Sequence, residues 1–229
     1  MTGAESRKQH SEQFLAKSGV IVDTSFPLFV SDEQARIKSV EEIARRAVAA
    51  FLTAQIAIDI CNGGDNLQKS VAAFGYLLDK HNARGELTPD ERRYFDPEHC
   101  GEITREDAFE MQWRVERCMP LFWALGMTDG DLDYPSRITD TDEIAKAVCG
   151  AKDLSEIIGK VDDLDTDEIL SNADTCMRMQ LACVQSRELG DPEIKGDLDS
   201  DVVSEQYLGF CWMVGACEGD DWDNPKTLF

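Results

Sequence analysis

The side chains with most capacity for chemistry lie in residues 112–126, QWRVERCMPLFWALG. Trp113, Arg114 and Glu116 place an aromatic ring and two opposite charges within a turn and a half of a predicted helix. Such a group either lines a cleft in which the arginine binds an anionic ligand, or forms structural ion pairs between packed helices. Acid–base chemistry needs groups held at a cavity. Because the sequence shows no cavity, we favour the structural interpretation.

A second charged pair and a C-terminal tryptophan extend this set. Asp174 stands four residues before Arg178, a spacing at which side chains on one helix face meet. Trp222 lies among acidic residues, where it is either a contact for a partner or a plug for the core. We favour the plug, because a large exposed aromatic ring is costly. The candidate ligand-binding residues are Trp113, Arg114, Glu116, Asp174, Arg178 and Trp222.

Motifs of known catalytic or metal chemistry are missing from the sequence. There is no Gly-x-Ser-x-Gly, no phosphate-binding glycine loop and no His-Glu-x-x-His. Three Asp-x-Asp-x-Asp runs, which start at Asp129, Asp163 and Asp197, lack the glycine and final glutamate of a calcium loop. The eight cysteines show no Cys-x-x-Cys spacing and are predicted to be reduced thiols. We therefore expect no catalytic residue, no metal site and no cofactor.

The charge of the chain is strongly negative and unevenly distributed. The formal net charge is −22, of which residues 129–229 carry −17. A field of this sign repels phosphate backbones and anionic lipids, so we expect no nucleic-acid and no membrane partner. A basic protein is the partner that the charge permits, although acidity also serves solubility alone. The N-terminus has no apolar signal region, which predicts a cytoplasmic protein.

Periodicity predicts a mainly α protein. We expect a single globular multi-helix domain over residues 1–229, with an extended segment near residues 20–30 and flexibility in residues 1–6 and the C-terminal tail. Capping and apolar spacing predict a helix that opens at Thr104, is kinked or divided at Pro120, and ends at Gly126. Further helices are predicted over residues 166–189 and 200–218.

Several sequence blocks together resemble one family. They are RKQHSEQFLAKSG (7–19), SVEEIARRAVA (39–49), WRVERCMPLFWALG (113–126), DEILSNADTCMRMQLACVQSR (167–187), VVSEQYLGFCWM (202–213) and DDWDNP (220–225). In this order, they are similar to the bacterial domain of unknown function family 4272. The resemblance implies a helical, soluble protein, and it implies no reaction, cofactor or catalytic residue.

The chain departs from the pattern of that family in two places. Where the family tends to have His-Trp-Ala soon after the arginine, Arg178 is followed by Met179 and Gln180. Gln206 and Cys211 stand where the family tends toward arginine and asparagine. These departures weaken an enzymatic interpretation.

Two functions of different classes follow from the sequence. The first is a non-enzymatic, acidic, cytoplasmic protein that acts through protein–protein interaction, with immunity-type binding of a basic partner as one form. The alternative is a small-molecule binder or hydrolase with a polar site around Trp113, Arg114, Glu116 and Arg178.

Overall fold

The computed structural model describes residues 3–64, 67–128, 132–159, 161, 164–218 and 221–227. Within these ranges every regular element is a helix, and the one β contact is an isolated antiparallel bridge between Glu218 and Lys226. The predicted mainly α fold is therefore confirmed. None of the described helices combines the length and apolarity needed to cross a membrane.

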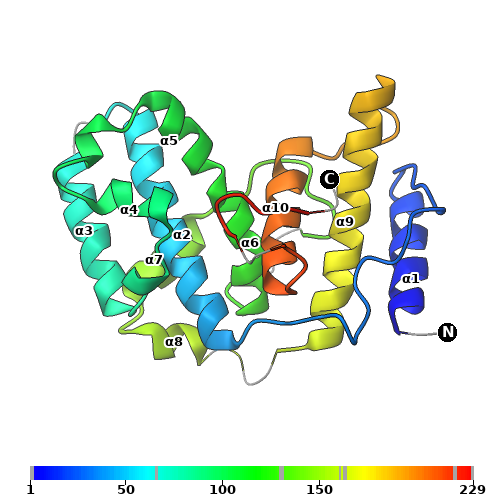
Figure 1. The fold of residues 1–229 in the computed structure, drawn as a ribbon, viewed down its shortest axis with the longest axis horizontal. Helices are drawn as coiled ribbons and strands as arrows, with labels where there is room; N and C mark the ends of the chain where they lie inside the picture. Colours follow the sequence, from blue (N-terminus) through cyan, green and yellow to red (C-terminus); the bar gives the residue numbers. More distant parts are fainter. Residues whose placement is uncertain are drawn as a thin grey trace. The chain divides into compact units, whose positions relative to one another are not determined.

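The chain folds into two compact units (Figure 1). Unit 1 comprises residues 1–38, 130–139 and 163–229, and unit 2 comprises residues 39–129 and 140–162. Each unit draws on segments that are distant in the sequence. A single domain over residues 1–229 stays a prediction.

Unit 1 is built on α9 (Thr166–Leu189), which packs against α1 (Gly3–Lys17) and α10 (Ser200–Met213). In Figure 1, α9 lies between the other two helices. The Asp165 carboxylate accepts a hydrogen bond from the Glu168 amide and so caps the start of α9. The helix ends at Gly190, which adopts a left-handed conformation with φ of 67°.

The segment that follows α1 forms no helix, as predicted. Residues 20–30, which we call the strap, form turns and bends but no strand or helix. Pro27 cannot donate a backbone hydrogen bond and disfavours helix in the residue before it. Beyond the strap, the amides of Arg36 and Lys38 bond to the carbonyls of Val214 and Met213, which ties this segment to the end of α10.

Aromatic side chains close the core of unit 1. Tyr207 is buried on α10 and lies 6.0 Å, between ring centroids, from Phe29 of the strap. Trp222 folds back onto Trp212 of α10 in an edge-to-face arrangement with centroids 5.4 Å apart. Trp222 is thus a buried part of the core.

Unit 2 surrounds α2 (Val40–Cys61), an alanine-rich helix whose middle is buried on every side. The helices packed on it are α3 (Leu67–Lys80), α4 (Pro89–Phe95), α5 (Arg105–Gln112), α6 (Arg114–Ala124) and α8 (Leu154–Ile158). The short helix α7 (Asp142–Gly150) and the 3-10 turns η1 (Arg84–Glu86) and η2 (Cys100–Glu102) complete the unit. Small side chains on α2 allow these close approaches, and Phe51 of α2 contacts Phe122 of α6 edge-to-face.

The predicted helix from Thr104 to Gly126 is divided, but in another place than expected. The break falls at Trp113, between α5 and α6, whereas Pro120 lies inside α6. A proline there removes the amide that would bond to the carbonyl one turn earlier. The residues around it, from Val115 to Phe122, are buried, and helices in proteins are stabilised mainly by such packing. The last helix also ends earlier than predicted, at Met213 instead of residue 218.

Candidate functional site

The first buried charge cluster lies in unit 1 and is centred on Arg178, whose side chain is 0% exposed. The Arg178 guanidinium donates to both carboxylate oxygens of Asp174, from Nε at 2.9 Å and from Nη2 at 3.2 Å. Its Nη1 lies 3.5 Å from Oε1 of Glu12 on α1. The predicted pairing of Asp174 with Arg178 is therefore present. We call Arg178, Asp174, Glu12 and the neighbouring Lys8 the Arg178 cluster.

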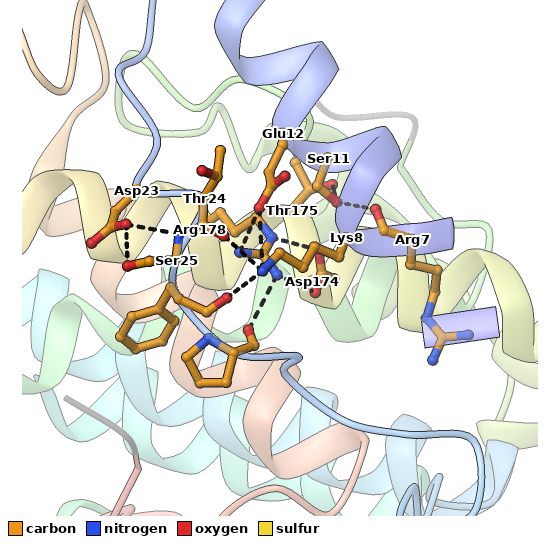
Figure 2. Close-up of polar contacts among 12 residues, drawn as sticks. Arg7, Lys8, Ser11, Glu12, Asp23, Thr24, Ser25, Asp174, Thr175 and Arg178 are labelled. Carbon is orange, nitrogen blue, oxygen red and sulfur yellow. Dashed lines mark hydrogen bonds and ion pairs between the residues drawn. The ribbon is translucent and has the colours of Figure 1, made fainter. Parts of the chain in front are cut away.

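Cations of unit 1 hold the strap by its backbone carbonyls (Figure 2). Nη2 of Arg178 donates to the carbonyl of Pro27 at 3.4 Å. Nζ of Lys8 donates to the carbonyls of Thr24 and Phe26 at 2.9 and 2.5 Å. Because the acceptors are backbone carbonyls, these hydrogen bonds fix the path of the strap without depending on its side chains.

The strap is anchored beyond the Arg178 cluster as well. Arg7 of α1 donates to Asp32 at 2.6 Å and to the carbonyl of Val30 at 3.1 Å. Gln185 of α9 donates to the Asp23 carboxylate at 3.4 Å. The pKa of Asp23 is lowered, mainly by its hydrogen bonds from Ser25. Side chains from both α1 and α9 thus hold the strap along its length.

The charges of the Arg178 cluster balance one another. Two cations, Arg178 and Lys8, lie with two acids, Asp174 and Glu12, and Lys8 is 3.7 Å from Glu12. A guanidinium held by two carboxylates offers little attraction to an external anion, because that anion would have to displace them. This geometry attaches the strap to α1 and α9.

The second buried cluster lies in unit 2 and has a carboxylate at its centre, where the first cluster has a guanidinium. Glu91 of α4 is 0% exposed and accepts from Nη2 of Arg46 on α2, at 2.6 Å to its Oε1. Nη1 of Arg114 on α6 approaches the same oxygen at 3.9 Å. Arg46 also donates to the carbonyl of Glu86 in η1. We call Glu91, Arg46 and Arg114 the Glu91 cluster.

The sequence-predicted site residues therefore separate between the two units. Trp113, Arg114 and Glu116 belong to unit 2, while Asp174, Arg178 and Trp222 belong to unit 1. Glu116 is buried on α6, and Trp113 forms the junction of α5 and α6. Each arginine of this set has a carboxylate partner within its own unit.

Sequence reasoning missed the partners that complete both clusters. Glu12 lies far along the chain from Arg178, and Arg46 lies far from Glu91, so an ordinary amphipathic helix explains each of them equally well. Glu91 carried one signal, since Thr88 and Glu91 form a capping box at the start of α4. That signal marks a helix start and does not show that the same carboxylate also pairs with a buried arginine.

Several other titratable groups are buried. No disulfide joins any of the eight cysteines in the structure, and burial raises the pKa of Cys176 and Cys183. His81 is fully buried, its Nε2 lies 2.9 Å from the carbonyl of Val148, and desolvation lowers its pKa. Among the described residues, no group of histidine, cysteine, aspartate or glutamate side chains is arranged to hold a metal. Asp129 and Asp163, which begin two of the Asp-x-Asp-x-Asp runs, lie outside the described residues.

Comparison with known families gives one match. The model of the family described as Domain of unknown function (DUF4272) matches residues 7–225, so the chain belongs to that family. No curated protein and no solved structure matches the chain.

Proposed function

We propose that this DUF4272 protein is non-enzymatic and acts in the cytoplasm by binding a basic protein. One observation carries the proposal: the two buried clusters do not contain the surplus of acids, because the Arg178 cluster has two cations and two acids and the Glu91 cluster has two cations and one acid. Around Arg178 and around Glu91, every charge has an opposite charge within reach. The net charge of −22 is left as an attractive field for a cationic surface.

Exposed acids occur in both units. By sequence, unit 1 has a net charge of −13 and unit 2 of −9. Around the start of α9, Asp165, Asp167 and Glu168 are exposed. Long-range attraction of this kind raises the rate of encounter with a basic partner and is screened by salt. Reduced thiols are the usual state in the cytoplasm, which supports the location proposed.

The alternative is a small-molecule binder or hydrolase around Trp113, Arg114, Glu116 and Arg178. Its residues are divided between the two units, and both arginines are engaged by carboxylates of the chain itself. The contacts of the described residues that are given above do not favour this alternative, and it stays a prediction.

The test is binding to the basic proteins encoded beside this gene. Each would be purified and titrated against this protein by calorimetry at low and at physiological ionic strength. We expect one of them to bind, with an affinity that falls as salt is added, because exposed charges are screened. Binding only to acidic or neutral proteins, or turnover of a small molecule in a substrate screen, would contradict the proposal.

A further inference from the structure

Two cysteines of unit 1 lie against each other at the C-terminal end of α10. Cys211 is on the last turn of the helix and is 1% exposed, while Cys217 lies beyond the helix and is half-buried. A hydrogen bond joins the two thiols. Two thiols in contact can do what a single buried cysteine cannot, because they can form a bond with each other.

The way α10 ends explains this contact. Gly215 has a left-handed backbone conformation with φ of 71°. Its amide bonds to the carbonyl of Trp212 at 3.2 Å, and the Ala216 amide bonds to the carbonyl of Cys211 at 2.7 Å. This pair of bonds is the Schellman ending, in which the chain turns back along the helix that it leaves. Cys217, the next residue, is thereby carried back beside Cys211.

The two thiols differ in their access to solvent. Cys217 is half-buried, so a dissolved oxidant can reach it. Burial raises the pKa of Cys211, and the hydrogen bond with Cys217 raises it further, so Cys211 keeps its proton at neutral pH. Cys217 therefore meets the oxidant first, and Cys211 reacts only with the sulfur that lies beside it.

We propose that Cys211 and Cys217 are a reversible dithiol–disulfide pair, which a hydroperoxide oxidises and which acts as a redox latch on the segment that follows α10. The Cys217 sulfur attacks one peroxide oxygen: an S–O bond forms, the O–O bond breaks, and water or an alcohol leaves. The Cys211 sulfur then attacks the Cys217 sulfur: the S–S bond forms, the S–O bond breaks, and the Cys211 proton leaves with the hydroxyl as water. The two thiols give up two electrons, which reduce the peroxide. The proposal is independent of the partner proposed above.

The disulfide attaches the C-terminal tail, which we define as residues 217–218 and 221–227, to α10 at its first residue. The tail places Trp222 edge-to-face on Trp212, the residue after Cys211. Within the tail, the Glu218 amide bonds to the carbonyl of Lys226 at 3.1 Å. Release of Trp222 requires the tail to move away from α10. A cross-link at Cys217 opposes this movement, because it removes conformations that the open chain could adopt.

A metal ion fits the pair less well than a disulfide. Among the residues that the structure describes, no three side chains of cysteine, histidine, aspartate or glutamate are arranged to hold one. Cys176 is the other thiol whose charge would act on Cys211, but it is 0% exposed on α9, where an oxidant does not reach it.

The experiment uses the full chain with Cys61→Ser and Cys149→Ser, which removes the other cysteines that are open to solvent and leaves six thiols. The reduced, folded protein is treated with hydrogen peroxide. Its thiols are then counted by alkylation after denaturation, and mass spectrometry of peptides locates any disulfide. Cys217→Ser and Cys211→Ala are made in this background, and Cys183→Ser, which removes a buried thiol of α9, is the matched control.

We expect the count to fall from six thiols to four, with a disulfide between Cys211 and Cys217 that dithiothreitol reverses. Cys183→Ser should still lose two thiols, and Cys217→Ser should lose none. In Cys211→Ala, oxidation should stop at a sulfenic acid on Cys217, which dimedone labels. A count that stays at six, a disulfide to another cysteine, or a dimer linked through Cys217 would overturn the pair.

Hydrogen exchange tests the latch on the same samples. Exchange of residues 221–227 should slow by about tenfold on oxidation and recover on reduction, while α2 in unit 2 should not change. If the disulfide forms but exchange of the tail stays the same, the latch is wrong.

Discussion

The two buried clusters have the same design with the charges reversed. In unit 1 a central arginine, Arg178, lies between two carboxylates, and in unit 2 a central carboxylate, Glu91, lies between two arginines. In both, a buried arginine also donates to the carbonyl of a segment outside the α-helices, at Pro27 of the strap and at Glu86 of η1. The pairing of ions therefore does more than join helices, because it fixes the loops that connect them.

The difference between the clusters lies in burial. Glu91 and Arg46 are both buried, whereas Glu12 and Lys8 remain partly open to water. A charge that loses its partner in a dry setting has no solvent to replace it, while a partly open one does. Damage to the Glu91 cluster should therefore cost more than matched damage to the Arg178 cluster.

The largest effect is expected for Glu91→Gln. The substitution keeps the size of the side chain but leaves the Arg46 guanidinium buried without its counter-charge, and we expect a loss of about 3–5 kcal/mol in unfolding free energy. Urea unfolding measures this loss. The matched control is Asp79→Asn, which breaks the exposed pair of Asp79 with Arg84 and should cost less than about 1 kcal/mol. Similar losses for both variants would show that the Glu91 cluster is not effectively buried.

Next in size is Arg178→Met, with an expected loss of about 3 kcal/mol. The substitution leaves Asp174 without its bidentate partner, while Glu12 keeps Lys8 and some water. The strap should also lose its anchor at Pro27, so hydrogen exchange of residues 20–30 should speed up more than that of α2 in unit 2. A variant that melts at or above the wild type would instead indicate that Arg178 is kept for a ligand.

Acidification should lower the stability of unit 2 more than that of unit 1. His81 lies in unit 2, and desolvation lowers its pKa below 6.5, so protonation is easier in the unfolded chain. The stability linked to His81 is complete above pH 6.5 and is lost as the pH falls toward its folded pKa, by at most about 1.4 kcal/mol per pH unit. Amide exchange of α3 and α7 between pH 7 and 5 measures this loss.

Two variants make the acid prediction specific. His81→Gln should remove the dependence on pH, whatever its effect on stability at pH 7. The exposed His99 has a pKa raised by Asp96, so its pairing is complete below pH 6.5 and weakens as the pH rises. His99→Gln should therefore leave the acid loss in place. Equal acid lability of both units in the wild type would count against a role for His81.

The smallest effect is expected for Arg114→Met. Its Nη1 lies 3.9 Å from Glu91, beyond hydrogen-bond distance, and Glu91 keeps its closer contact with Arg46. We expect a loss of about 1 kcal/mol, in the direction of a structural role. Arg46→Met, which removes the short contact, should cost more. If the order of these two variants were reversed, Arg114 would be the principal partner of Glu91.

Local features of the sequence determined the helical elements. Apolar spacing and caps placed α9 at residues 166–189, as observed, because both signals depend only on neighbouring residues. Pro27 marked the strap as non-helical for the same reason. The pairing of Asp174 with Arg178 was also accessible, since residues four apart meet on any helix.

The tertiary structure decided which distant charges meet. The sequence does not distinguish Arg178 from Arg114. In the structure, Arg178 pairs with Glu12 of α1, and Arg114 approaches Glu91 of α4. Likewise, the break at Trp113 instead of Pro120 depends on how α5 and α6 pack. Periodicity and caps are set within one or two helical turns, whereas the partner of a buried charge is set by which helices fold against each other. Periodicity and caps can therefore be predicted from one sequence, whereas the partner of a buried charge is known only once the fold is known.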